Sequence, residues 1–325
     1  MNSTGHMILF QMAYNNMTPQ TQQRVSQILA DPNNPEENGY QTDQRDDDVP
    51  TAATYPDVYK QDARRDDLGD PKSYDHFYNF PIGDPQYTAG KTVPSPNAAT
   101  QLASQIAILK DPSSSLDMQA DALRWTTHLY GDIGAQPGHV VDYYSAQFPN
   151  GDGGGNRFNL TWGSAGKYDN NLHELLDEGG AGVNASGAEE NNYKYLPDPL
   201  TADSRAWIEN RAESLQQQFP RARFETQVQD QNPQDWVKTL SNEAVNIWGE
   251  FTPGESVQPS DPRLAGIEQT MNQNVAIAAY RLADLCNQLY GSTSAVAQSV
   301  AHVPPHAPVN PPAPAASSLL PGHSH

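Results

Sequence analysis

Apolar residues recur at helical spacing in five segments of this chain, at positions 18–29, 116–130, 201–218, 234–248 and 262–290. In the last segment one face is occupied by Ile267, Met271, Val275, Ala278, Leu282 and Leu285. Such spacing is typical of an amphipathic helix. Alternating apolar and polar residues, the pattern of a half-buried strand, are nearly absent. The pattern predicts an all-α fold.

The stretches between these segments have a different composition. Positions 32–97 and 146–170 are rich in Asp, Asn, Gly and Pro, so we expect long surface loops there. From Gly291 onward the chain has no Asp, Glu, Lys or Arg and is dominated by Pro, Ala, Ser and His. Such a composition cannot form a core. We therefore predict one folded domain at 1–290 and a disordered tail at 291–325.

Composition and charge exclude several classes of protein. The 325 residues include 39 Asp and Glu against 19 Lys and Arg, a net charge of −20 that excludes a basic nucleic-acid coat protein. No run of about 18 apolar residues is present, so we expect no membrane span, and no charged-then-apolar leader precedes residue 30. Hydrophobic residues make up only 36 % of the chain, against about 45–50 % in typical domains. We infer that something other than apolar packing supplements the core.

Five of the nine histidines lie in the predicted domain, and the other four lie in the tail. Two of the five begin a His-x-x-x-Asp spacing, His128 with Asp132 and His173 with Asp177. On a helix, residues at this spacing share a face, so the imidazole and the carboxylate reach one metal ion. A single such pair is usually a polar pair on a helix surface, but its repetition favours a metal site. Histidine and carboxylate without thiolate suit zinc and are typical of a hydrolytic site.

The histidines lie in recognisable motifs. Residues 128–139 read His-Leu-Tyr-Gly-Asp-Ile-Gly-Ala-Gln-Pro-Gly-His, 152–156 read Asp-Gly-Gly-Gly-Asn, and 171–177 read Asn-Leu-His-Glu-Leu-Leu-Asp. These three motifs resemble His-x-x-Gly-Asp-x-His-Gln-Pro-Leu-His, Asp-x-Gly-Gly-Asn and Asn-Leu-His-x-x-Trp-Asp of the trinuclear-zinc phospholipase C and single-strand-specific nuclease family, which includes nucleases S-one and P-one. Gly5-His6 resembles the end of that family's Trp-Gly-x-x-Gly-His opening, and 278–287 resembles its last helix. The resemblance covers 1–290.

This resemblance implies a mostly helical domain with long loops around a cleft that holds three zinc ions. One ion would be bound by His139, His173 and Asp177. A second would be bound by Asp57, His76, His128 and Asp132, with Asp132 bridging to the third. The third would be bound by His6 and by the amine and carbonyl of Met1.

The activity implied by the resemblance is that of a zinc-dependent endonuclease, which hydrolyses single-stranded DNA and RNA to 5′-phosphate products. Asp57, Lys60 and Asp132 are its candidate catalytic residues. The resemblance also implies a secreted or periplasmic enzyme, and we expect a monomer without a protein partner. A zinc-dependent phospholipase C and a zinc-binding homologue with reduced activity are the alternatives, and the Gly-Gly-Asn run favours the nuclease.

Candidate substrate-binding residues follow the second histidine and the glycine run: Phe77, Asn79 and Asn156. Phe77 is suited either to stacking on a nucleobase or to ordinary core packing. Asn79 stands where the family has an Asp that contacts the base, and its amide offers both a donor and an acceptor. The sequence therefore leaves the base preference of this chain open.

Other departures from the family concern the metal site itself. Met1 stands in place of the opening Trp, and Lys60 in place of an Arg that holds the phosphate. One extra residue lies between Asp132 and His139, where Pro137 cannot continue a regular helix, so we expect a local bulge. Asp62, Asp66 and Asp67 follow Asp57 closely in the sequence, so each is an alternative to Asp57 as the carboxylate ligand. Three tryptophans on helical faces, Trp125, Trp236 and Trp248, are predicted to lie in the core.

Overall fold

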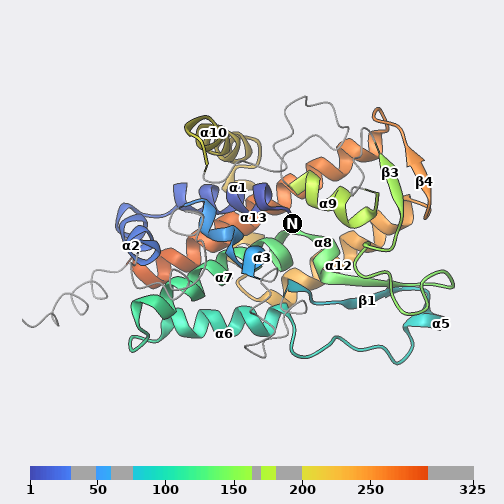
Figure 1. The fold of residues 1–325 in the computed structure, drawn as a ribbon, viewed down its shortest axis with the longest axis horizontal. Helices are drawn as coiled ribbons and strands as arrows, with labels where there is room; N and C mark the ends of the chain where they lie inside the picture. The colour runs from blue at the N-terminus through green and yellow to red at the C-terminus, as the bar shows by residue number, and fades with distance from the viewer. Residues whose placement is uncertain (31–48, 60–75, 163–169, 181–199, 292–325) are drawn as a thin grey trace, which may run out of the picture. The chain divides into compact units, whose positions relative to one another are not determined.

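The computed structural model describes residues 1–30, 49–59, 76–162, 170–180 and 200–291, and it groups Met1–Gly291 into one compact unit. Helices dominate the described part of this unit (Figure 1), which confirms the predicted mostly helical fold. The longer ones are α1 (Ser3–Asn15), α2 (Pro19–Leu29), α6 (Ala98–Lys110), α7 (Leu116–Ala135), α9 (Leu172–Gly180), α10 (Ala202–Gln218), α12 (Pro233–Glu250) and α13 (Pro262–Tyr290). The short ones are η2 (Thr51–Thr54), α3 (Tyr55–Tyr59), α5 (Pro85–Thr88), α8 (Pro137–Val140), η4 (Arg221–Arg223) and α11 (Glu225–Gln229). Of the described helices, none combines the length and the apolar content that crossing a membrane requires. The predicted tail lies outside the described residues, apart from Gly291.

Polar caps and prolines set where the predicted helices begin. Thr18 accepts a hydrogen bond from the Thr21 N–H (3.2 Å) and is followed by Pro19, so α2 starts as the sequence predicts. Asn232 caps α12 and Asp261 caps α13 in the same manner, each with proline at the first helical position. Each proline gives up only an N–H that the first helical turn would leave without a partner.

Three of the longer helices lie outside the five predicted segments: α1, α6 and α9. Helix α9 carries the His173–Asp177 pair, whose spacing was interpreted on the assumption of a helix. Almost the whole of α1, from Thr4 to Ala13, is buried. A helix that is apolar on nearly every side has no amphipathic period for the pattern to detect. Helix α6 begins at Ala98, directly after the segment expected to be a loop, and its start is fixed by an Asn97 capping box.

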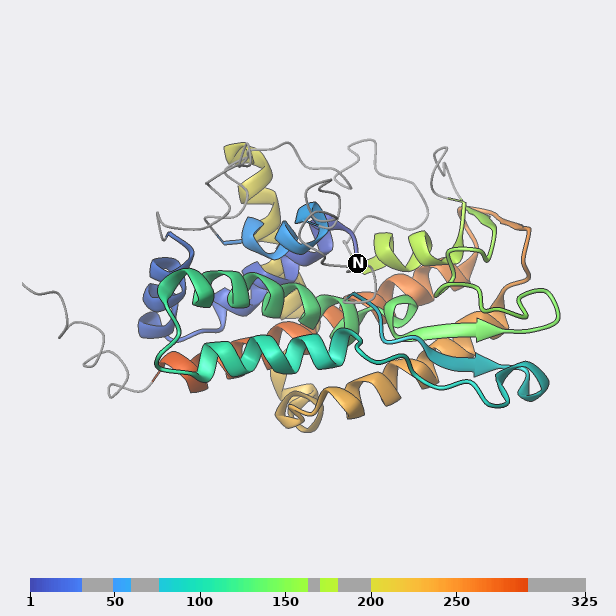
Figure 2. The same ribbon diagram turned by 60° about the horizontal axis from the view of Figure 1, so that its bottom comes forward.

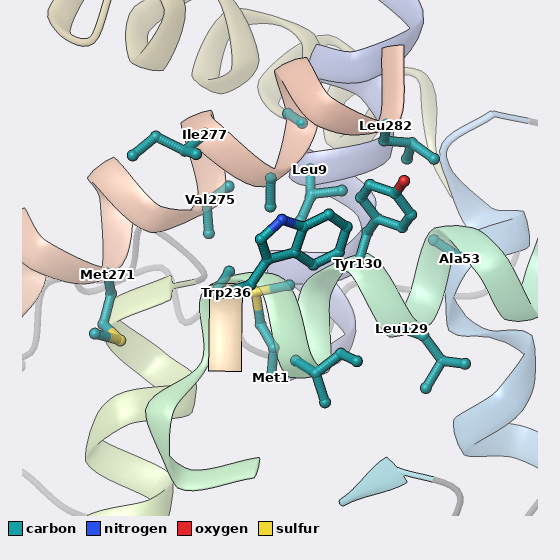
Figure 3. Close-up of a cluster of buried hydrophobic side chains, with 14 of the residues drawn as sticks. Met1, Leu9, Ala53, Leu129, Tyr130, Trp236, Met271, Val275, Ile277 and Leu282 are labelled. Atoms are coloured by element: carbon teal, nitrogen blue, oxygen red, sulfur yellow. The ribbon is translucent and has the colours of Figure 1, made fainter. Parts of the chain in front are cut away.

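The hydrophobic core lies around α13, which packs against α1, α7 and α9. Figure 3 shows part of this core, where Leu9 of α1, Tyr130 of α7, Trp236 of α12 and Val275 of α13 meet. Helices α6 and α7 run antiparallel beside one another (Figure 2). Metal-site candidates occur on three of these core helices, so the core fixes their positions.

Short strands occur in segments for which the sequence predicted no strand. Strand β1 (Phe80–Gly83) pairs in parallel with β2 (Val141–Tyr144), and β3 (Leu160–Trp162) pairs in parallel with β4 (Glu255–Val257). Each ribbon joins segments far apart in the chain, and no local alternation marks such pairs. The N–H of Tyr78 also donates to the His139 carbonyl at 2.8 Å. The first ribbon thus fixes α8 against the segment that carries His76.

Candidate metal centre

All nine predicted metal ligands lie in described segments, and the structure brings them together. The contributing segments are the chain start and α1 (Met1, His6), α3 (Asp57), the residue before β1 (His76), α7 (His128, Asp132), α8 (His139) and α9 (His173, Asp177). Eight of them form three groups, which are His6–His128–Asp132, Asp57–His76–His128 and His139–His173–Asp177. Within each group the donor atoms lie within 4.8 Å of one another. The first two groups share His128, and Asp132 lies 3.1 Å from His76 Nδ1 and 3.4 Å from His139 Nδ1, so the three groups form one cluster.

Helical spacing produces both His-x-x-x-Asp pairs. His128 Nε2 lies 3.0 Å from Asp132 Oδ2, and His173 Nε2 lies 3.8 Å from Asp177 Oδ2. The two oxygens of Asp132 face different neighbours: Oδ2 is 3.1 Å from His76 Nδ1, whereas Oδ1 is 3.3 Å from His6 Nε2. This carboxylate therefore has the geometry to bridge two ions.

The amine of Met1 is buried in the middle of the cluster. It lies 2.8 Å from His139 Nε2, 3.0 Å from Asp177 Oδ1 and 3.4 Å from Asp132 Oδ1. Gly131 makes room for this chain end, because a β-carbon there would come within 2.7 Å of His6 Nδ1 and 2.5 Å of the Met1 methyl group. The glycine of the His-x-x-Gly-Asp motif thus permits residue 1 to approach α7.

Backbone carbonyls orient three of the imidazoles. Nδ1 of His128 lies 2.8 Å from the Ala53 carbonyl, and Nδ1 of His139 lies 3.0 Å from the His76 carbonyl. Nδ1 of His173 lies 2.9 Å from the Gly154 carbonyl. A carbonyl accepts only from N–H, so these contacts place the proton on Nδ1 and leave Nε2 as the metal-binding nitrogen.

The extra residue in the signature is accommodated by a helix break rather than by the expected bulge. Helix α7 ends at Ala135, Gln136 is extended, and Pro137 begins the separate turn α8 that carries His139. Gln136 is buried, accepts from the Gly138 N–H and donates to Asp177 Oδ1 at 2.5 Å. Gln136 therefore connects the break to a candidate ligand on α9.

The charges of the cluster hold its groups in unusual protonation states. Burial disfavours the charged form of Asp132, but the positive charges of His128, His139 and the chain-end amine outweigh it and hold the pKa of this carboxyl well below its usual range. Burial, assisted by the charge of His128, lowers the pKa of His6 to about 4. Burial also opposes charge on the Met1 amine, yet the nearby carboxylates raise its pKa above the ordinary value. Neutral His6 and ionised Asp132 are the forms that bind metal.

Two observations support a fit to zinc. The donor set consists of imidazoles, carboxylates and one amine, without thiolate, which suits zinc in a hydrolytic site. Among the described residues, neither ring nitrogen of buried His6 has a hydrogen-bond partner. A buried polar atom without a partner destabilises the fold, and a metal bond to Nε2 of His6 would remove part of this cost.

The residues predicted to bind substrate differ in how buried they are and in what they contact. The ring of Phe77 is half-buried and stacks on His139, with centroids 4.7 Å apart. Asn79 follows it in the left-handed backbone region at φ 58°, which is uncommon for a residue other than glycine. Asn156 is exposed in the glycine loop, and its amide donates to the Gly153 carbonyl. Lys60 lies outside the described residues.

Residues behind the ligands were not assigned a role from the sequence. Gln136 stands inside the recognised signature, but its contact with Asp177 depends on the helix break. Trp125, Trp236 and Trp248 are buried, as predicted. Trp248 nevertheless has a polar partner, because its indole N–H donates to Asp152 Oδ2 at 2.7 Å.

Residues 2–291 match the family described as S1/P1 Nuclease. No curated protein sequence matches the chain.

Proposed function

The chain belongs to the S1/P1 nuclease family, and on this basis we propose that it is a zinc-dependent endonuclease that hydrolyses single-stranded DNA and RNA to 5′-phosphate products. Membership makes it a nuclease that acts on nucleic acid; the metal, the strand preference and the product are proposed. We further propose that residues 1–290 are the catalytic domain, that 291–325 are a disordered tail, and that the enzyme is a monomer that works outside the cytoplasm.

One observation carries the proposal: three groups of metal-binding donors converge on the carboxylate of Asp132. That carboxylate is fully buried, with one oxygen toward His6 and the Met1 amine and the other toward His76 and His128. The group of His139, His173 and Asp177 reaches the same amine through His139 and Asp177. This arrangement suits several ions close together, which is how hydrolases clamp a phosphodiester.

The residues present have definable tasks in such a reaction. Zinc bound here would lower the pKa of a water and neutralise charge on the phosphoryl oxygens. The carbonyls of Ala53, His76 and Gly154 keep three imidazoles in the metal-binding tautomer. Asp57 approaches the cluster from α3, with Oδ1 3.8 Å from His128 Nε2, and is less buried than the histidines.

Nucleic acid would be held beside His139 and His173. The ring of Phe77 is tilted toward His173, with centroids 6.1 Å apart, and stacks on His139. Stacking tolerates every base and needs an unpaired strand, so Phe77 supports the single-strand preference. Asn79, two residues later, would contact the edge of the base, and Lys60 would contact the phosphate.

The test compares zinc-loaded protein on single-stranded DNA, duplex DNA, RNA and phosphatidylcholine vesicles. We expect cleavage of the single strands, loss of activity with a chelator, and DNA ends that ligase joins without prior phosphorylation. Cleavage of the vesicles alone would support the phospholipase C alternative. Zinc binding without cleavage of any substrate would support the inactive homologue.

Substitution of Asp132 tests whether the cluster is needed for zinc binding and activity. Asp132→Ala removes the carboxylate common to the donors, so we expect loss of bound zinc, at least about a 100-fold drop in activity and a lower melting temperature. The control is Glu243→Ala, which removes a half-buried carboxylate on α12 that pairs with Asn274. The proposal is wrong if Asp132→Ala retains its zinc and its activity.

A further inference from the structure

We propose that Asp152 and Trp248 are positioning residues for His173, acting through the glycine loop at residues 151–155. The inference rests on the proposed function, because it assumes that His173 binds metal. Neither residue belongs to the three donor groups. They lie behind the centre, at one end of α12 and in the loop that precedes β3.

Asp152 is a fully buried carboxylate bound by N–H groups. Its Oδ2 accepts from the Trp248 indole at 2.7 Å, and its Oδ1 accepts from the Tyr143 backbone N–H at 3.1 Å. Hydrogen bonds to an ionised acceptor are about twice as strong as neutral ones. The carboxylate therefore holds the loop to β2 and to α12.

The same loop holds His173 in two places. The Gly154 carbonyl lies 2.9 Å from the His173 ring Nδ1, and the Gly155 carbonyl accepts the His173 backbone N–H at 3.4 Å. Gly153, Gly154 and Gly155 all have positive φ, between 65° and 93°. This backbone path turns the two carbonyls toward the start of α9, and it is favourable only for glycine.

Close packing leaves the loop little freedom to shift. A β-carbon on Gly154 would collide with the Gly138 carbonyl of α8. A β-carbon on Gly155 would come within 2.9 Å of the His173 nitrogen and 3.2 Å of the Trp248 ring. The loop is thus confined between α8, α9 and α12, so a displacement of Asp152 or Trp248 passes to the carbonyl that orients His173.

Both oxygens of Asp152 accept from N–H, which makes a carboxylate necessary at this position. An asparagine has one acceptor and one donor group, so Asp152→Asn places an NH₂ against either the indole or the Tyr143 N–H. Trp248→Phe keeps an aromatic ring but removes the indole donor. Each change leaves His173 and the loop glycines in place while it weakens the support behind them.

The experiment pairs Trp248→Phe with Trp236→Phe. Trp236 is also a buried tryptophan of α12 whose indole donates at 2.7 Å, but its acceptor is the Asp230 carbonyl, outside the glycine loop. The first readout is the ring tautomer of His173 in zinc-free protein, from ¹⁵N chemical shifts assigned by comparison with His173→Ala. We expect a single Nδ1–H form in the parent and in Trp236→Phe, and a mixture of forms in Trp248→Phe.

The second readout is zinc affinity, measured by competition with a chromophoric chelator. We expect Trp248→Phe and Asp152→Asn to weaken the most affected ion by about 10–100-fold, as is typical for loss of support behind a ligand. We expect Trp236→Phe to leave it unchanged. In a His173→Ala background Trp248→Phe should have no further effect, since the ligand that it supports is absent.

The outcomes separate this inference from the proposed function. Equal effects of the two tryptophan variants, or a His173 tautomer unchanged in both Trp248→Phe and Asp152→Asn, would overturn it. The tautomer is read without metal and without substrate, so a parent protein that binds no zinc would contradict the proposed function while this readout still decides the inference. If Trp248→Phe does not fold, Asp152→Asn provides both readouts, with Glu243→Gln as its control.

Discussion

A carboxylate buried away from water is stable only where cations or N–H groups surround it, and Asp132 has such surroundings. Nitrogens of Met1, His6, His76, His128 and His139 lie within 3.4 Å of its oxygens. The attraction of the charged nitrogens outweighs the cost of burial, since the pKa of Asp132 is held well below the usual range. Metal entering this position has to displace protons from the nitrogens and none from the carboxylate.

The protonation of two nitrogens leads to a prediction on pH. Burial opposes charge on both His128 and the Met1 amine, but the neighbouring carboxylates raise the pKa of each above its ordinary value. Zinc binds only their deprotonated forms. We therefore expect zinc affinity to rise with pH between about pH 6 and pH 9, with more than one proton released per chain at the lower end. Chelator competition at several pH values measures the affinity, and calorimetry in buffers of different ionisation enthalpy counts the protons. A flat affinity over this range would contradict the assignment of these nitrogens as ligands.

Among the helices and strands, those that depend on local sequence features were the ones that could be predicted. Helices α2, α12 and α13 follow from their apolar period and from a polar residue before proline. Helix α1 does not, because its burial on nearly all sides removes the period. The two parallel ribbons depend on partners far away in the chain, which a local pattern does not contain.

The candidate site divides in a similar way. The side chains of the ligands could be proposed from the His-x-x-x-Asp spacing and from the family resemblance, because the sequence gives the identity of each side chain directly. The contacts that orient the ligands could not be predicted. They are made by the backbone carbonyls of Ala53, His76 and Gly154, and every residue has such a carbonyl, so the residue type does not mark them. The role of Trp248 was hidden for another reason: a buried tryptophan is usually a core residue, and only its distance to Asp152 reveals a second task.

The start of α1 provides a prediction at this scale. Asn2 caps α1 by accepting from the Gly5 N–H, and this cap holds Met1 against α7. A single glycine added before Met1 moves the free amine by about 3.8 Å and replaces it with an amide that does not bind zinc. We expect at least about a tenfold loss of zinc affinity and of activity.

The control for this change is one glycine inserted into the exposed turn of residues 111–115, which joins α6 to α7. It lengthens the chain equally, and we expect it to leave zinc affinity unchanged. Full zinc affinity in the chain extended before Met1 would show that the amine is not a ligand. Chelator competition on both chains supplies the comparison.

At the scale of the whole molecule, the centre brings together segments that are far apart in the sequence. Residues of α1, α3, α7, α8 and α9 meet there, together with the segment before β1. Metal that binds the folded chain and not the unfolded one stabilises it by mass action. We expect this link between distant segments to be the supplement to the core that the low hydrophobic content indicates.

Metal removal tests that role directly. An ion present at a thousand times its Kd contributes about 4 kcal/mol, so chelation should lower the melting temperature of a domain of this size by about 7 °C for each ion removed. Calorimetric scans with and without a chelator check this, and the same chelator preloaded with zinc is the control. An unchanged melting temperature would show that the fold does not depend on the centre.

The contact between the Met1 amine and Asp177 also has a consequence for the order of events during synthesis. Met1 and α1 are made before α13, which packs against α1, α7 and α9. At about 5–20 residues per second, roughly 15–60 s separate the synthesis of Met1 from that of Tyr290, the last residue of α13. Throughout that interval α1, α7 and α9 lack the helix against which they pack, so the centre is completed only once α13 has been made. The metal available where folding ends, rather than where synthesis begins, then sets how much of the protein is loaded.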